Sequence, residues 1–142
     1  MDDERLARLH ILLVDDEPDV VRGITRVMHQ RHPGWTVHMA VAVTDAMRIL
    51  SSRGPDIDAA VCDINMPTLP GTSLLKLIQD LFPWIARITL SGMLDPGSIL
   101  GASRFAEVHL CKPLPAERLC DEIIRLCRER SGTAERVPRP LP

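Results

Sequence analysis

Charged and hydroxyl side chains stand at the ends of four short apolar runs in this 142-residue sequence. The first run ends in Asp15 and Asp16, the second in Asp63, the third in Ser91 and the fourth in Lys112. Carboxylates that lie close together repel one another unless a cation is present, and carboxylate oxygens with room for water suit Mg²⁺. A carboxylate nucleophile beside such a metal is the chemistry of an aspartyl phosphate.

Asp63 is the only charge in the stretch AAVCDINM. A lone charge among apolar residues costs free energy unless something pairs with it. Lys112 could pair with this carboxylate or with an oxygen of a phosphoryl group, and the Ser91 hydroxyl could donate a hydrogen bond. Taken singly, these residues also have simpler interpretations, since the first pair of acids could cap a helix and Asp63 could form a turn.

The elements that would position these residues alternate along the chain. Apolar or β-branched runs predict strands, and apolar residues at helical spacing predict helices. The expected strands cover residues 10–14, 35–40, 57–64, 86–92 and 108–112. The expected helices cover residues 19–31, 44–54, 72–82, 96–106 and 115–130. This alternation predicts a doubly wound α/β fold, a five-stranded parallel sheet with helices on both faces.

The placement of the polar residues agrees with such a sheet. Ligands of doubly wound sheets bind just beyond the carboxyl ends of the strands, where the strand order reverses. The polar residues that end the four apolar runs all fall at the carboxyl ends of predicted strands. We therefore expect the acids, the hydroxyl and the ammonium group to converge on one rim.

Composition narrows the function classes. Apolar residues are 45% and charged residues 25%, which are ordinary values for one globular domain, and the net charge is −2. This balance does not favour nucleic-acid binding. The start of the chain lacks the apolar core of a signal peptide, and no apolar run approaches the ~20 residues of a membrane helix. We therefore expect a cytoplasmic domain over residues 10–130, with an extension at 1–9 and a tail or linker at 131–142.

Four stretches of the sequence closely resemble the receiver domain of two-component response regulators, in the order and approximate spacing of that family. The stretches are LLVDDEP (12–18), CDINMPTLPG (62–71), TLSG (89–92) and CKP (111–113). The resemblance covers about residues 10–130 and implies a flavodoxin-like (βα)5 fold. It also implies that Asp63 accepts a phosphoryl group from a histidine kinase or a phosphotransfer protein and that the domain then switches an output domain or partner.

The resemblance assigns further roles. It implies a Mg²⁺ site whose ligands are Asp15, Asp16, Asp63 and the backbone carbonyl of Asn65, with Asp16 the better candidate of the first two for direct coordination. Ser91 takes the Thr/Ser switch position, Lys112 binds the phosphoryl group, and Gly92 is the small residue that leaves its pocket open. Partners would bind through the face formed by residues 96–130, and the chain could also form a homodimer.

Three positions bear on how such a switch would work. His109 stands where receivers often carry Tyr or Phe, so a switch role for this side chain and a simple packing role both stay open. Met93 stands where many receivers carry a polar residue. Met93 and Asn65 occupy the two positions through which receivers commonly tune the lifetime of the phosphoryl group. A looser resemblance links residues 87–114 to receivers attached to HDOD or HD-type output domains.

Three other classes of protein share parts of this pattern. A phosphatase of the haloacid dehalogenase type would carry an acid two residues after the nucleophile, where this chain has Asn65. A flavodoxin-like cofactor binder would need a phosphate-cradling loop after the first strand, where the acidic stretch DDEPD would repel phosphate in the absence of a metal. A receiver-shaped interaction module could work without phosphorylation. With the acceptor and metal residues intact, we expect a phosphorylated switch and not an enzyme that acts on an external substrate.

Overall fold

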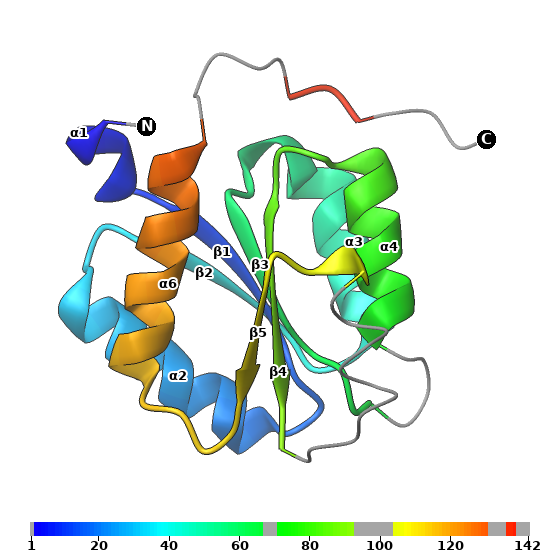
Figure 1. Cartoon of the computed structure of the whole chain (residues 1–142), viewed down its shortest axis with the longest axis horizontal. Coiled ribbons are helices and arrows are strands. Elements are labelled where there is room, and N and C mark those ends of the chain that lie inside the picture. The colour runs from blue at the N-terminus through cyan, green and yellow to red at the C-terminus, as the bar shows by residue number, and fades with distance from the viewer. Residues whose placement is uncertain (1, 67–70, 93–103, 131–135, 139–142) are drawn as a thin grey trace.

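The computed structural model describes residues 2–66, 71–92, 104–130 and 136–138 of the chain. Five parallel strands form one sheet in the order β2-β1-β3-β4-β5 (Figure 1). The strands are β1 (His10–Val14), β2 (Thr36–Ala40), β3 (Ala59–Asp63), β4 (Ala86–Ser91) and β5 (Val108–Cys111). This order is that of the flavodoxin-like folds. The fold class predicted from the sequence is therefore confirmed.

Helices cover both faces of the sheet, with α2 and α6 on one face and α3 and α4 on the other (Figure 1). The helices are α1 (Asp3–Leu6), α2 (Pro18–Arg31), α3 (Val43–Arg53), α4 (Gly71–Leu81) and α6 (Ala116–Glu129), and a 3₁₀ turn, η1, covers Gly54–Asp56. The bounds of α2, α3, α4 and α6 lie within two residues of the sequence-based expectations, whereas α1 and η1 were not predicted. The helix expected at 96–106 falls largely outside the described residues. No described helix is both long and apolar enough to cross a bilayer.

The continuous apolar character of β1 follows from this layering. Ile11 and Leu13 pack into the core beneath α2 and α6, whereas Leu12 and Val14 pack into the core beneath α3 and α4. Successive side chains of a strand point to opposite faces, so a strand covered on both sides is apolar at every position. The two cores hold the carboxyl ends of β1, β3 and β4 in fixed register.

The residues that precede β1 also pack on the sheet. Leu6 and Leu9 are buried in the core on the α2 and α6 side. The Trp35 indole donates a hydrogen bond from Nε1 to the Leu6 carbonyl at 2.8 Å. Trp84 likewise donates from Nε1 to the Gly54 carbonyl at 3.2 Å. Both tryptophans are thus packing residues, each with its indole N–H bonded to a backbone carbonyl.

Two glycines are expected to respond to alanine in opposite directions. A Cβ at Gly54 would collide with the ring of Phe82, which packs edge-on against Trp84, so Gly54→Ala is expected to lower the free energy of unfolding by about 1–3 kcal/mol. A Cβ at Gly23, inside α2, would meet no atom of the described residues within 4 Å outside the backbone of its own helix. Gly23→Ala is therefore expected to raise stability by about 0.5–1 kcal/mol. Urea unfolding of the two variants checks both signs, and a stabilised Gly54→Ala protein would contradict the packing described.

Candidate functional site

The carboxyl ends of four neighbouring strands bring the predicted residues together. Asp15 follows β1, Asp63 ends β3, Ser91 ends β4 and Lys112 follows β5. The chain leaves β1 toward β2 on one side and leaves β3 toward β4 on the other, so the strand order reverses between β1 and β3. Open α/β sheets bind their ligands at this position. Asp63 stands at its centre.

The Lys112 ammonium group joins the two buried carboxylates. Its Nζ lies 2.7 Å from Asp15 Oδ2 and 3.4 Å from Asp63 Oδ2. Both acid side chains are buried, whereas Lys112 is 22% exposed. Burial alone would lower the pKa of Lys112, but the hydrogen bond to Asp15 and the charges of both carboxylates outweigh it and raise the pKa above its ordinary value. The lysine thus stays charged and compensates the charge of Asp63.

The two carboxylates are held in the same way. Asp15 Oδ1 accepts a hydrogen bond from the backbone N–H of Glu17 at 3.0 Å, and Asp63 Oδ1 accepts one from the N–H of Asn65 at 2.9 Å. Each acid thus uses one oxygen to fix the turn that follows it and presents the other oxygen to Lys112. Local turn chemistry therefore orients both side chains.

Asn65 also connects the turn after β3 with the end of β4. Its side-chain Nδ2 donates a hydrogen bond to the Ser91 hydroxyl oxygen at 3.2 Å. Ser91 is buried, whereas Asn65 is exposed. Gly92 follows directly, and of the described residues that are not its chain neighbours, the nearest to a Cβ there would be Lys112, whose Cδ lies 4.0 Å away. Met93 lies outside the described residues.

The turn after β1 gathers oxygen ligands suited to a hard cation. Asp15, Asp16 and Glu17 each offer a carboxylate oxygen, and these three atoms lie within 4.8 Å of one another. Asp16 is half-buried and makes no hydrogen bond or ion pair within the described part of the chain, so its carboxylate can serve a ligand. This donor set fits Mg²⁺, which takes one or two carboxylates and keeps several waters. Glu17 adds an acid that the family resemblance does not assign.

His109 contacts β4 through a residue that sequence reasoning did not single out. Its Nδ1 lies 2.7 Å from the hydroxyl oxygen of Thr89, which is fully buried. The other ring nitrogen, Nε2, is buried without a hydrogen-bond partner in the described residues. Burial lowers the pKa of His109 below its ordinary value of 6.5. The register pairs Thr89 with His109, so this contact could have been found once β4 and β5 were aligned.

The lowered pKa of His109 predicts how stability changes with pH. The unfolded chain binds a proton at this residue more readily than the folded chain does. The free energy of unfolding is therefore expected to decrease as the pH falls below about 6.5, and to recover as the pH rises back to that value. Burial also lowers the pKa values of His32 and His38, which add to the slope. His109→Phe should flatten the profile in part, because it removes one of these three groups. Urea unfolding from pH 5 to 8 measures the slopes, and an unchanged slope in His109→Phe would contradict the assignment.

Comparison with known proteins identifies the class of domain that this fold and this rim define. The family model of the response regulator receiver domain matches residues 11–124. The chain belongs to this family. The predicted family membership is thus confirmed, and with it the role of a signalling module of two-component systems.

Individual relatives agree. A receiver domain protein from Clostridium thermocellum is 30% identical with a TM-score of 0.77, over 84% of this chain and 94% of that one. The signal receiver domain of an HD domain-containing protein from Pseudomonas fluorescens Pf-5 is 27% identical with a TM-score of 0.74, over 85% of this chain and 95% of that one. The transcriptional regulatory protein PrrA of Mycobacterium tuberculosis is 31% identical over 87% of this chain. The chain spans 52% of the length of PrrA.

Proposed function

We propose that Asp63 accepts a phosphoryl group from a histidine kinase or a phosphotransfer protein and that Mg²⁺ bound at the same rim is required. The observation that carries this proposal is the position of Lys112, whose Nζ lies within 3.4 Å of an oxygen of Asp63 and within 2.7 Å of one of Asp15. Bound Mg²⁺ would neutralise phosphoryl charge. Asp16 and Asp15 would hold it, together with Asp63 and the carbonyl of Asn65.

The transfer is a displacement at phosphorus. A carboxylate oxygen of Asp63 forms a bond to phosphorus while the bond from phosphorus to the imidazole nitrogen of the donor breaks, and the imidazole keeps that electron pair. Lys112 supplies the fixed positive charge that the phosphoryl oxygens meet on arrival. Gly92 leaves room for them. The domain needs no turnover of an external substrate for this role.

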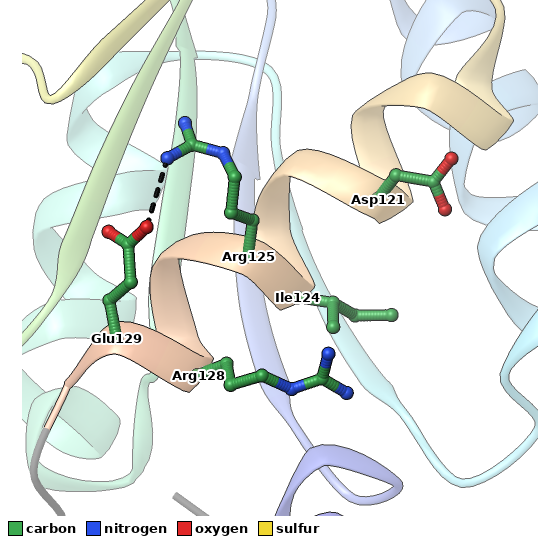
Figure 2. Close-up of a pocket in the computed structure, with 5 residues that line it drawn as sticks. All are labelled: Asp121, Ile124, Arg125, Arg128 and Glu129. Atoms are coloured by element: carbon green, nitrogen blue, oxygen red, sulfur yellow. Dashed lines mark hydrogen bonds and ion pairs between the residues drawn. The ribbon is translucent and has the colours of Figure 1, made fainter.

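The switch would act through Ser91. Phosphoryl oxygens are strong acceptors, so they would draw the Ser91 hydroxyl away from its hydrogen bond with Asn65. This movement would change the surroundings of β4, where Thr89 binds His109. The signal would reach partners through residues 96–130, of which β5 and α6 are described. Figure 2 shows that the outer surface of α6 is charged, with an ion pair between Arg125 and Glu129.

An apolar groove beside Lys112 offers a place for the phosphoryl donor to dock. Its cavity of about 450 Å³ is lined by residues of α2 and of the segment after β5, among them Val20, Ile24 and Leu114. A donor bound there would lie next to the rim.

We further propose that the receiver unit comprises residues 10–130 and works in the cytoplasm, and that Asn65 and Met93 tune the lifetime of the phosphoryl group.

Beryllofluoride, a mimic of the acyl phosphate, tests the proposed function. In Mg²⁺, the mimic should shift the amide resonances of Asp63, Ser91 and Lys112 and then those of β5 and α6, and Asp63→Asn should abolish the response. Mg²⁺ alone should shift only residues 15–17 and 63–65. A spectrum that beryllofluoride leaves unchanged in the presence of Mg²⁺ would instead support a module that works without phosphorylation.

Removal of Asp16 is expected to weaken Mg²⁺ binding. Asp16→Ala deletes a carboxylate that has no other described partner, so the dissociation constant should rise by at least about tenfold, while stability changes little. Asp19→Ala is the matched control, since Asp19 is exposed at the start of α2 and pairs with Arg22. Calorimetric titration measures both affinities. An unchanged Mg²⁺ affinity in Asp16→Ala would show that Asp16 is only a charge near the helix.

A further inference from the structure

A third buried carboxylate, Asp58, lies at the amino ends of the strands, opposite the rim that contains Asp15 and Asp63. It directly precedes β3, the strand that ends in Asp63, and its side chain is fully buried. Its Oδ2 accepts a hydrogen bond from the backbone N–H of His10 at 2.8 Å. Its Oδ1 accepts from Arg5 Nη2 and from Arg136 Nη2, each at 2.9 Å. Both oxygens are thus engaged by groups far apart in the sequence.

Arg136 makes more than an ion pair. Its Nη1 lies 3.3 Å from the Ile57 carbonyl and 3.4 Å from the Pro55 carbonyl. The carboxylate and the two carbonyls therefore face the fork of one guanidinium group, which carries five N–H donors in a fixed plane. The Arg136 side chain is 23% exposed, whereas the next residue, Val137, is 59% exposed. The guanidinium group of Arg136 thus reaches the buried carboxylate of Asp58, whereas the neighbouring residue, Val137, stays at the surface.

The acceptors of this site belong to the folded domain. Pro55 lies in η1, and Ile57 and Asp58 follow it before β3 begins. The Asp58 backbone is itself fixed between two strands, since its N–H donates to the His10 carbonyl at 2.8 Å and its carbonyl accepts from Ala86 N–H at 3.0 Å. Arg5 already compensates the charge of Asp58. The added contacts to the neutral carbonyls of Pro55 and Ile57 explain why a second guanidinium group, that of Arg136, can bind the same carboxylate.

We propose that Asp58 and the carbonyls of Pro55 and Ile57 form a binding site for an arginine side chain, which Arg136 of the same chain occupies. Occupation docks residues 136–138 at the amino ends of the strands, on the side of the sheet opposite Asp63. This site is separate from the rim that contains Asp63, and its occupation by Arg136 does not depend on phosphorylation. A surface ion pair would contribute little, but here the acceptor carboxylate is fully buried, so the docking is expected to persist in moderate salt.

Full-length Arg136→Ala, without phosphorylation, tests the site, and Arg128→Ala is the control. Arg128 is an exposed arginine of α6, drawn in Figure 2, whose carboxylate partner, Asp3, lies 3.9 Å away. In Arg136→Ala the amide resonances of His10 and Asp58 should move, and the ¹⁵N relaxation of Val137 should become that of a free tail, with an order parameter below about 0.6. Arg136→Lys keeps the charge but loses the fork, so Val137 should loosen there too.

Methylguanidinium provides the positive test. Added to Arg136→Ala, it should return the His10 amide toward its wild-type position in a saturable way, because it fills the vacated site, while Val137 stays mobile. Wild type and Arg128→Ala should show no such saturable change, since Arg136 competes. Unchanged His10 and Asp58 resonances in Arg136→Ala, or the same methylguanidinium response in Arg128→Ala, would overturn the proposal. Neither outcome bears on phosphorylation of Asp63.

Discussion

Asp63→Asn is expected to reduce labelling of the protein by acetyl phosphate and Mg²⁺ below detection. An amide has no anionic oxygen to attack phosphorus, and the substitution also removes one of the negative charges that surround the proposed metal. The fold should survive, because the amide oxygen can still accept the hydrogen bond from the Asn65 N–H that Asp63 Oδ1 accepts at 2.9 Å. A loss of labelling in a folded protein would therefore report the chemistry of this side chain alone.

The control for this variant is Asp80→Asn, which neutralises an exposed acid of α4 that pairs with Lys76 at 3.0 Å. It should be labelled as fast as wild type. Intact mass should show one added phosphoryl group in wild type and in the control, and none in Asp63→Asn. Undiminished labelling of Asp63→Asn would place the acceptor elsewhere. Asp58 is a poor alternative acceptor, since Arg5, Arg136 and His10 already occupy both of its oxygens.

The rim itself could be predicted from the sequence because it depends on one rule of topology. Parallel strands end at the same edge, so polar residues at four strand ends must lie near one another, and Asp15, Asp63 and Lys112 do. The distances could not be predicted. Lys112 lies closer to Asp15, at 2.7 Å, than to Asp63, at 3.4 Å, and no residue pattern in the sequence encodes this difference.

The contacts of Asp58 at the amino ends of the strands could not be predicted from the sequence. Asp58 falls within a stretch that the pattern predicts as strand, and Arg5 and Arg136 fall within the expected extension and tail. Their contacts join residues 53 and 78 positions apart. No local periodicity or turn signal encodes such a pairing, because an exposed arginine near a chain end has the same sequence signature whether or not it finds a buried carboxylate. Only the packed structure identifies the partner.

Lys112→Met is expected to lower the free energy of unfolding by about 2–3 kcal/mol in the absence of divalent cations. The substitution keeps much of the aliphatic side chain but leaves Asp15 and Asp63 buried next to each other without the ammonium group that contacts both. Lys76→Met is the matched control: this lysine is 60% exposed and pairs with Asp80 one turn away, an interaction worth only about 0.3–0.5 kcal/mol.

Mg²⁺ should reverse part of this loss, and this response distinguishes the Lys112→Met effect from simple misfolding. A cation held by the same rim replaces the missing positive charge, so saturating Mg²⁺ should stabilise Lys112→Met more than wild type, with a lower dissociation constant in the variant. Phosphorylation should nevertheless slow by at least about tenfold, because no ammonium group remains to meet the phosphoryl oxygens. Urea unfolding with and without Mg²⁺ gives the stabilities, and intact mass against time gives the rate. If Mg²⁺ stabilised wild type and Lys112→Met equally, the lysine and the metal would not compensate the same carboxylates. The proposed Mg²⁺ ligands would then be Asp16 and Glu17 alone.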